Sequence, residues 1–174
     1  MTQSDIKKIV ENLIQTFLDA GKISIDLRKK GLTKEIKSDN TPVSNGDLEV
    51  NKILSKKILS LTPNIPIVSE ETSENKSKNN LENFWLIDPI DGTYDYINDL
   101  DEFTINAGLI IQKKPVAGLI YAPAKNRMFY SYGDDFSFEL INGEPIKLDN
   151  SKNFDKNEIK FVSYSNKILS LIHI

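Results

Sequence analysis

An apolar run that ends directly on acidic residues sets the strongest condition on the fold of this chain. Residues 84–87 are Phe-Trp-Leu-Ile, and residues 88–93 are Asp-Pro-Ile-Asp-Gly-Thr. A short apolar run is typical of a buried strand, Pro89 fixes one backbone dihedral, and Gly92 allows a close backbone approach. The sequence therefore predicts a sheet in which one buried strand delivers two carboxylates, three residues apart, into a turn.

The two carboxylates of this turn, Asp88 and Asp91, can bind a hard divalent cation. We expect a short helix over residues 93–97, whose first amides point at the same place and can hold a phosphate group. For a single aspartate, a capped turn is the better interpretation. The complete strand and turn, however, favour metal-assisted phosphoryl transfer.

Acidic residues elsewhere are candidates for the same site. Glu70 and Glu71 follow a short apolar strand, and adjacent acids repel each other unless a cation or water separates them. Beside the aspartate motif, this pair becomes a candidate third ligand. Asp47 lies three residues after Ser44, which is close to a capping box, so the residues alone favour a capping role for Asp47.

The composition excludes several kinds of chemistry. The chain has 174 residues, no cysteine and one histidine, His173. There is then no disulfide framework, thiolate metal site or Cys nucleophile, and one His nearly excludes His-based zinc sites and Ser-His-Asp catalysis. The formal net charge of -3 argues against a broad nucleic-acid interface, so we expect no nucleic-acid partner.

Targeting signals and membrane spans are not expected. Residues 1–9 lack a basic region followed by an apolar stretch. No run approaches the ~18 apolar residues that a membrane span needs. We therefore expect a cytoplasmic protein without a transmembrane segment, with peripheral association at the inner face of the membrane as the alternative.

The remaining pattern predicts two helices and a series of short strands. The first helix is capped by Ser4 and ends near Gly21 or somewhat later, and the second starts at Ser44 and stops before Pro63. Strands are expected at residues 35–37, 66–68, 103–111, 116–121, 127–132, 136–141 and 161–164, and an exposed loop at residues 72–83. Two helices with a multi-strand sheet indicate an α/β domain with α+β layering.

Two other acidic motifs fit less well. Haloacid-dehalogenase-type phosphatases carry Asp-x-Asp-Gly-Thr after a buried strand, whereas two residues separate the acids here. That spacing breaks the geometry in which one acid attacks and its neighbour but one protonates. An EF-hand loop needs acids at alternating positions and a Glu at the twelfth, which residues 88–99 do not supply.

The aspartate string, with Glu70 and Glu71 upstream, resembles the signature of the inositol monophosphatase-like superfamily. Members of that superfamily are Mg²⁺-dependent, often lithium-sensitive phosphomonoesterases. Further segments resemble its branch of bacterial CysQ-type 3′(2′),5′-bisphosphate nucleotidases, and these are residues 40–47, 61–71, 102–106 and 116–123. The resemblance runs from about Ser4 to Ser165 and implies two helices packed on a mostly antiparallel sheet, as in the N-terminal domain of the sugar-phosphatase fold.

The resemblance also implies a metal site. Glu70, Asp88 and Asp91 match the family's metal-ligating carboxylates, and Ile90 would add its backbone carbonyl. The implied cofactor is Mg²⁺, with two or three ions in the complete fold.

Substrate contacts and catalytic residues follow from the same match. The positions that match substrate contacts are Glu70, Ile90, Asp91, Gly92 and Thr93. Thr93, with Glu70 or Asp47, would position and deprotonate the attacking water. The resemblance thus reverses the preference for a capping role at Asp47.

The implied reaction is direct in-line attack of water on a phosphate ester. The substrate would be 3′-phosphoadenosine 5′-phosphate, converted to AMP and phosphate, with lithium inhibition and a place in sulfur assimilation. An inositol or sugar phosphatase is the alternative of the same class.

The chain departs from the family in one respect. A Trp-Asp-x-Ala-Ala element, which carries another metal-binding acid in a second α/β half, does not occur in this sequence. We therefore expect residues 1–165 to form the N-terminal metal- and phosphate-binding domain, residues 166–174 to be an aberrant or truncated tail, and the C-terminal domain to be absent. A truncated, non-catalytic remnant is therefore an open alternative to an enzyme. An exposed sheet edge in such a chain predicts poor solubility or association, such as a homodimer.

Overall fold

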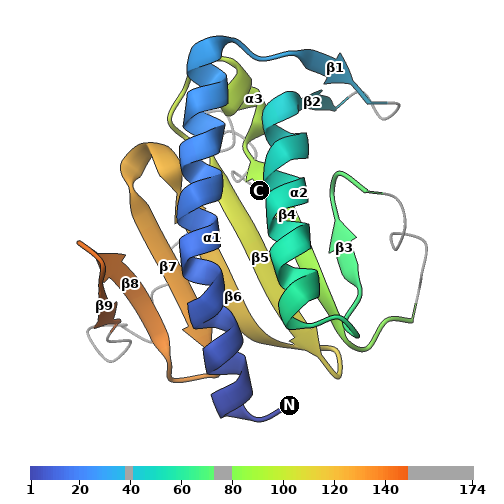
Figure 1. Cartoon of the computed structure of the whole chain (residues 1–174), viewed down its shortest axis with the longest axis vertical. Helices are drawn as coiled ribbons and strands as arrows, with labels where there is room; N and C mark the ends of the chain where they lie inside the picture. Colours follow the sequence, from blue (N-terminus) through green and yellow to red (C-terminus); the bar gives the residue numbers. More distant parts are fainter. Residues whose placement is uncertain (38–40, 73–79, 149–174) are drawn as a thin grey trace, which may run out of the picture.

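Two helices lie side by side across one face of a seven-stranded sheet in this computed structural model (Figure 1). The structure describes residues 1–37, 41–72 and 80–148. The helices are α1, Gln3–Lys30, and α2, Asn45–Leu61. The strand expected at residues 161–164 and the tail expected at residues 166–174 lie outside the described residues.

The sheet has the order β3-β4-β5-β6-β7-β8-β9, and only its β3–β4 pair is parallel. Its strands are β3 (Ile67–Ser69), β4 (Phe84–Asp91), β5 (Thr104–Ile111), β6 (Lys114–Ala122), β7 (Arg127–Tyr132), β8 (Ser137–Ile141) and β9 (Glu144–Lys147). The smaller elements are β1 (Lys34–Ile36), β2 (Pro42–Ser44), α3 (Thr93–Ile97) and the 3₁₀ turn η1 (Pro123–Lys125). The expected α+β layering on a mostly antiparallel sheet is confirmed.

Several details of the expected elements differ from the structure. The helix α1 continues beyond Gly21 to Lys30, and the short strand β2 was not expected. The cap of α1 is Thr2 rather than Ser4, because Thr2 and Asp5 form a capping box in which each side chain bonds the other's backbone amide. The strand β9 was not expected, because its residues are exposed and include Pro145, which is tolerated at a sheet edge.

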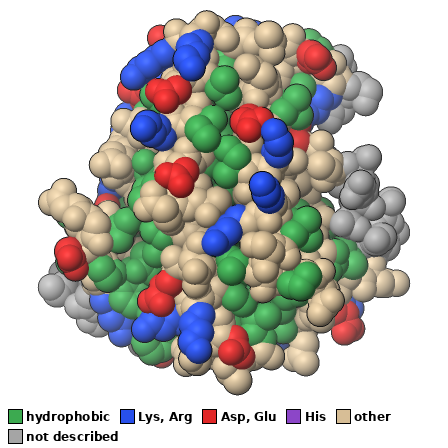
Figure 2. Space-filling model, in the orientation of Figure 1, with side chains coloured by type: hydrophobic (Ala, Val, Ile, Leu, Met, Phe, Trp, Pro, Cys, Tyr) green, Lys and Arg blue, Asp and Glu red, His purple; other side chains and the backbone are tan. Residues whose placement is uncertain are grey.

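The outer surface of the helices carries charges of both signs. Figure 2 shows Lys and Arg side chains interspersed with Asp and Glu and with apolar side chains on this face. Among the described residues, no helix combines the length and the apolar character that a membrane crossing requires.

The core lies between the helices and the sheet, and Trp85 of β4 is its largest fully buried side chain. The indole Nε1 donates to Thr62 Oγ1 at 3.0 Å, and that hydroxyl donates in turn to the Ile58 carbonyl at 2.9 Å. The Thr62 hydroxyl at the end of α2 therefore accepts a hydrogen bond from a buried donor of β4. This bond joins the helix to the strand that carries the acidic residues.

Thr62→Val is expected to lower the free energy of unfolding by about 1–2 kcal/mol, because the indole N–H of Trp85 stays buried without an acceptor. Urea denaturation followed by the fluorescence of Trp85 measures this loss. The control is Thr62→Ser, which keeps the hydroxyl and is expected to retain most of the stability. A Thr62→Val variant as stable as the wild type would show that the hydrogen bond to Trp85 contributes nothing to the free energy of unfolding.

A β-bulge positions the two aspartates of β4. Asp88 pairs with Asn106 and Asp91 with Thr104, and the register shifts between the two pairs. Strict alternation from Trp85 would direct Asp91 into the core. The bulge instead buries Ile90, which is 1% exposed, and leaves Asp91 exposed. Both aspartates are consequently kept off the core face of the strand.

Candidate active site

Four short segments meet at the end of the strands β3 and β4. They are the residues after β3, the bulged end of β4, the first turn of α2 and the start of α3. Each segment lies where the sequence predicts that a helix or strand begins or ends. All the acidic residues predicted for the site, together with Thr93, lie in these segments.

Asp47 combines a capping role with a contact inside the site. Its Oδ2 accepts from the Ser44 amide at 2.8 Å and from Ser44 Oγ at 2.6 Å, as in a capping box. Its Oδ1 accepts from Thr93 Oγ1 at 3.1 Å. Asp47 is 1% exposed, so α2 presents one fixed carboxylate oxygen to Thr93. The capping interpretation is confirmed, and the structure also brings Asp47 and Thr93 together.

The hydroxyl of Thr93 has two acceptors. Besides Asp47, the Ile90 carbonyl lies 2.9 Å from Thr93 Oγ1. The proton of the hydroxyl is thus directed toward the Asp47 side and the backbone, which leaves its oxygen lone pairs for an incoming donor.

Asp88 is the most perturbed acid of the site. Burial, together with the nearby charges of Glu70 and Asp91, raises its pKa to about 7. Within the described residues, Asp88 Oδ1 and the Oδ1 of its cross-strand neighbour Asn106 are buried without a hydrogen-bond partner. Two acceptor oxygens with no donor are a place where a cation or a proton would be stabilised.

Glu71 and Glu70 face a lysine. Lys37 Nζ lies 2.8 Å from Glu71 Oε1 and 3.4 Å from Glu70 Oε1. The Glu71 side chain is 4% exposed and the Lys37 side chain 21%. Burial raises the pKa of the Glu71 carboxyl, although the Lys37 ammonium opposes that shift. The Lys37 ammonium thus offsets the negative charge of Glu71, which is the more buried of the two carboxylates.

Gly92 forms the turn between β4 and α3. Its φ of +92° lies in the left-handed region, and a Cβ there would stand 2.7 Å from the Glu102 carbonyl oxygen. A pocket of about 240 Å³ opens beside this turn, lined by Asp91, Gly92, Asp95, Glu102 and Thr104. The three acids of the lining would repel a phosphate unless cations lie between them.

Mg²⁺ fits this site by donor type, since it prefers carboxylate and carbonyl oxygens. The unpartnered oxygens of Asp88 and Asn106 and the acidic pocket support that match. Among the described residues, however, no three acidic or His side chains are gathered closely enough to hold an ion as they stand. The assignment of Glu70, Asp88, Asp91 and the Ile90 carbonyl as metal ligands therefore stays a prediction.

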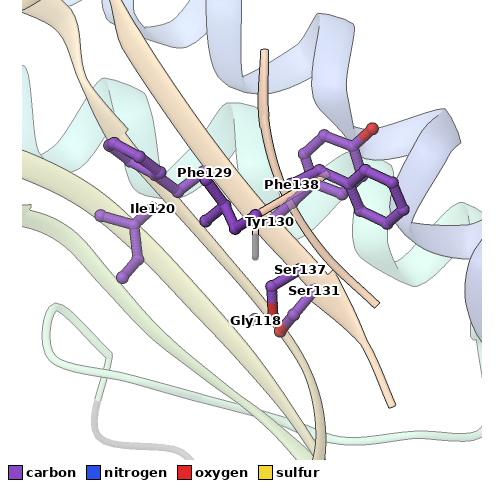
Figure 3. Close-up of a pocket in the computed structure, with 8 residues that line it drawn as sticks. Gly118, Ile120, Phe129, Tyr130, Ser131, Ser137 and Phe138 are labelled. Carbon is purple, nitrogen blue, oxygen red and sulfur yellow. The ribbon is translucent and has the colours of Figure 1, made fainter. Parts of the chain in front are cut away.

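A second pocket lies on the sheet away from these acids. Its volume is about 220 Å³, and it is lined by residues of β6, β7 and β8 with Leu148 (Figure 3). Ile120 and Phe129, which are cross-strand neighbours, lie side by side at its edge. No acid lines it, so it lacks the carboxylates that would hold a divalent cation.

Lys37 and Asn106 were missed as members of the site. Asn106 lies within the segment 102–106 that carries the family resemblance, and Asp91 Oδ2 accepts from its Nδ2 at 3.2 Å. Lys37 closes the strand expected at residues 35–37, where nothing in the local pattern distinguishes it from other lysines.

Comparison with known proteins gives a consistent result. A family model described as the inositol monophosphatase family matches residues 5–169. The 3′(2′),5′-bisphosphate nucleotidase CysQ of Haemophilus influenzae is 36% identical over 140 residues, 79% of this chain and 52% of that protein. The protein of that name from Buchnera aphidicola is 34% identical over 132 residues, 74% of this chain and 50% of that one. The chain spans about half the length of these curated relatives.

Solved structures agree on the fold. The extragenic suppressor protein SuhB of Bartonella henselae superposes with a TM-score of 0.67 at 23% identity, and the match covers 76% of this chain and 52% of that one. The Thermotoga maritima IMPase gives a TM-score of 0.64 at 24% identity, with 79% and 52% covered. These likenesses show the arrangement of helices and sheet, and the resemblance seen in the sequence is confirmed.

Proposed function

The chain belongs to the inositol monophosphatase family, and from this premise we propose that it carries the metal- and phosphate-binding part of a Mg²⁺-dependent phosphomonoesterase. The proposed substrate is 3′-phosphoadenosine 5′-phosphate, hydrolysed to AMP and phosphate. The observation that carries the proposal is the contact between Thr93, Asp47 and the acidic end of β4. The substrate follows from the names of the relatives, which are bisphosphate nucleotidases.

Asp47 and Thr93 provide a route for a proton. A water that donates to Thr93 Oγ1 can pass a proton to that hydroxyl, while Thr93 passes its own proton to Asp47 Oδ1 at 3.1 Å. The Ser44 cap holds Asp47 in place for this exchange. These two residues would orient the water and accept its proton, and the Gly92 turn would seat the phosphate.

Glu70, Asp88 and Asp91, with the Ile90 carbonyl, would hold the metal. When bound, Mg²⁺ supplies charge neutralisation for the phosphate oxygens, a lower pKa for the attacking water and stabilisation of the leaving oxygen. Two or three ions, lithium sensitivity, a cytoplasmic location and a link to sulfur assimilation belong to the same proposal. So does the assignment of residues 1–165 as one metal- and phosphate-binding domain.

Phosphate release by the chain tests the substrate. We expect Mg²⁺-dependent release from 3′-phosphoadenosine 5′-phosphate to exceed that from an inositol monophosphate, measured side by side as initial rates. Faster release from the inositol ester would identify an inositol phosphatase instead. A folded chain that releases phosphate from neither ester, at any Mg²⁺ concentration, would indicate a non-catalytic domain.

A further inference from the structure

Asn106 of β5 links the two aspartates of the acidic turn. In the ladder between β4 and β5, Asn106 is the cross-strand neighbour of Asp88. Its side chain, however, bonds the other aspartate across the β-bulge, because its Nδ2 donates to Asp91 Oδ2 at 3.2 Å. One asparagine is therefore paired with the first aspartate through the sheet and bonded to the second through its carboxamide.

The carboxylate of Asp91 determines which way this carboxamide is turned. An ionised carboxylate only accepts hydrogen bonds, so the amide presents its NH₂ group to Asp91 and directs its oxygen elsewhere. That oxygen, Asn106 Oδ1, is buried and has no hydrogen-bond partner among the described residues, and the same holds for Asp88 Oδ1. The carboxamide thus serves Asp91 at the cost of an unsatisfied acceptor of its own.

Asp91 is the aspartate that gains from being held. It is exposed, whereas Asp88 is half-buried, and an exposed side chain exchanges between rotamers. The bond from Asn106 restricts that exchange before any ligand binds. A carboxylate that is already oriented loses less conformational entropy when it binds a cation, so residues that hold metal ligands in place raise the affinity for the metal.

We propose that Asn106 is a positioning residue for the divalent cation, holding the Asp91 carboxylate in the orientation in which it receives the ion. This rests on the proposed function only in requiring a divalent cation at Asp91. The fold gains little from the same hydrogen bond, because its acceptor is exposed and the Asn106 oxygen stays buried without a donor. Cation affinity and stability should therefore respond differently when the carboxamide is removed.

Binding of Mn²⁺, as a probe for the divalent site, tests the proposal. We expect Asn106→Leu, which is similar in size but cannot donate, to bind Mn²⁺ about 10-fold more weakly than the wild type, measured by electron paramagnetic resonance. The matched control is Asn12→Leu on α1. Asn12 also donates through its Nδ2, at 2.8 Å, but to the Lys8 carbonyl rather than to an acid. We expect that control to bind Mn²⁺ as the wild type does.

Thermal unfolding in EDTA separates a positioning role from a structural one. Asn106→Leu should melt at no lower a temperature than the wild type, since the variant loses an unsatisfied buried acceptor together with the hydrogen bond. Asn106→Ala is the second variant, and it excludes an effect of the bulk of leucine. It should show the same weaker Mn²⁺ binding.

Three results would overturn the proposal. If both folded variants bind Mn²⁺ as tightly as the wild type, Asn106 does not position Asp91, while the metal site stands. If both variants fail to fold, or melt at a clearly lower temperature in EDTA, Asn106 is a structural residue. If the wild type and the Asn12→Leu control are folded and bind no Mn²⁺, the metal site of the proposed function is wrong, and the role of Asn106 falls with it.

Discussion

Asp88→Asn is expected to lower Mg²⁺-dependent phosphate release by about 100-fold or more, because metal stabilisation of the transition state is worth several kcal/mol and each 1.36 kcal/mol is tenfold in rate. Asp88 lies at the centre of the acidic group, with Glu70 and Asp91 as neighbours. An amide is a much poorer ligand for a hard cation than a carboxylate, so Mn²⁺ binding should weaken in parallel with turnover.

The same substitution is expected to make the metal-free protein more stable. It removes a half-buried charge that repels its neighbours, and it supplies a donor beside the unpartnered Asn106 oxygen. We expect a gain of about 1–2 kcal/mol in the free energy of unfolding in EDTA, since a residue that serves function often costs stability. The two effects have opposite signs, which separates loss of the site from loss of the fold.

The control for this variant is Asp26→Asn, which removes one carboxylate from the exposed surface of α1. It should change neither phosphate release nor stability appreciably. Asp88→Asn with the turnover of the wild type would place the metal site elsewhere, and Asp88→Asn that is inactive but also unstable in EDTA would make Asp88 a structural residue.

The strand, turn and short helix at the centre of the site could be predicted because neighbouring residues determine them. The apolar run predicts the start of β4 but not its end, because the strand continues past residue 87, through a bulge, to Asp91 before the turn at Gly92. The helix α3 covers the residues expected for it. The start of α2 at Ser44 could be predicted for the same reason, since a capping box involves residues that are only three apart in the sequence.

Features that depend on distant partners were not accessible in this way. The bulge that turns Asp91 away from the core arises from pairing with Thr104 on β5. Lys37 and Glu71 are 34 residues apart in the sequence, and their contact joins the end of β1 to the residues after β3. The pairing of Lys37 with Glu71 and the unpartnered oxygens are what the structure adds to the family resemblance.

Gly92→Ala is expected to cost about 2–4 kcal/mol in the free energy of unfolding, from the left-handed backbone and from a steric clash. The new Cβ would stand 2.7 Å from the Glu102 carbonyl oxygen. That segment cannot easily yield, because Arg28 donates to the Leu100 carbonyl at 2.6 Å and pairs with Asp101 at 3.0 Å. The strain should therefore fall on the turn itself and move Thr93 away from Asp47.

The matched control is Gly143→Ala in the β8–β9 turn. Gly143 has a similar φ of +84°, but a Cβ there meets no atom within 4 Å. It should lose only about 1 kcal/mol, the cost of the left-handed backbone for a residue with a side chain. Urea denaturation of both variants isolates the clash, and phosphate release should fall with Gly92→Ala alone. Equal losses of stability in the two variants, with turnover unaffected in both, would mean that the turn can relax and that close approach at Gly92 is not needed for the site.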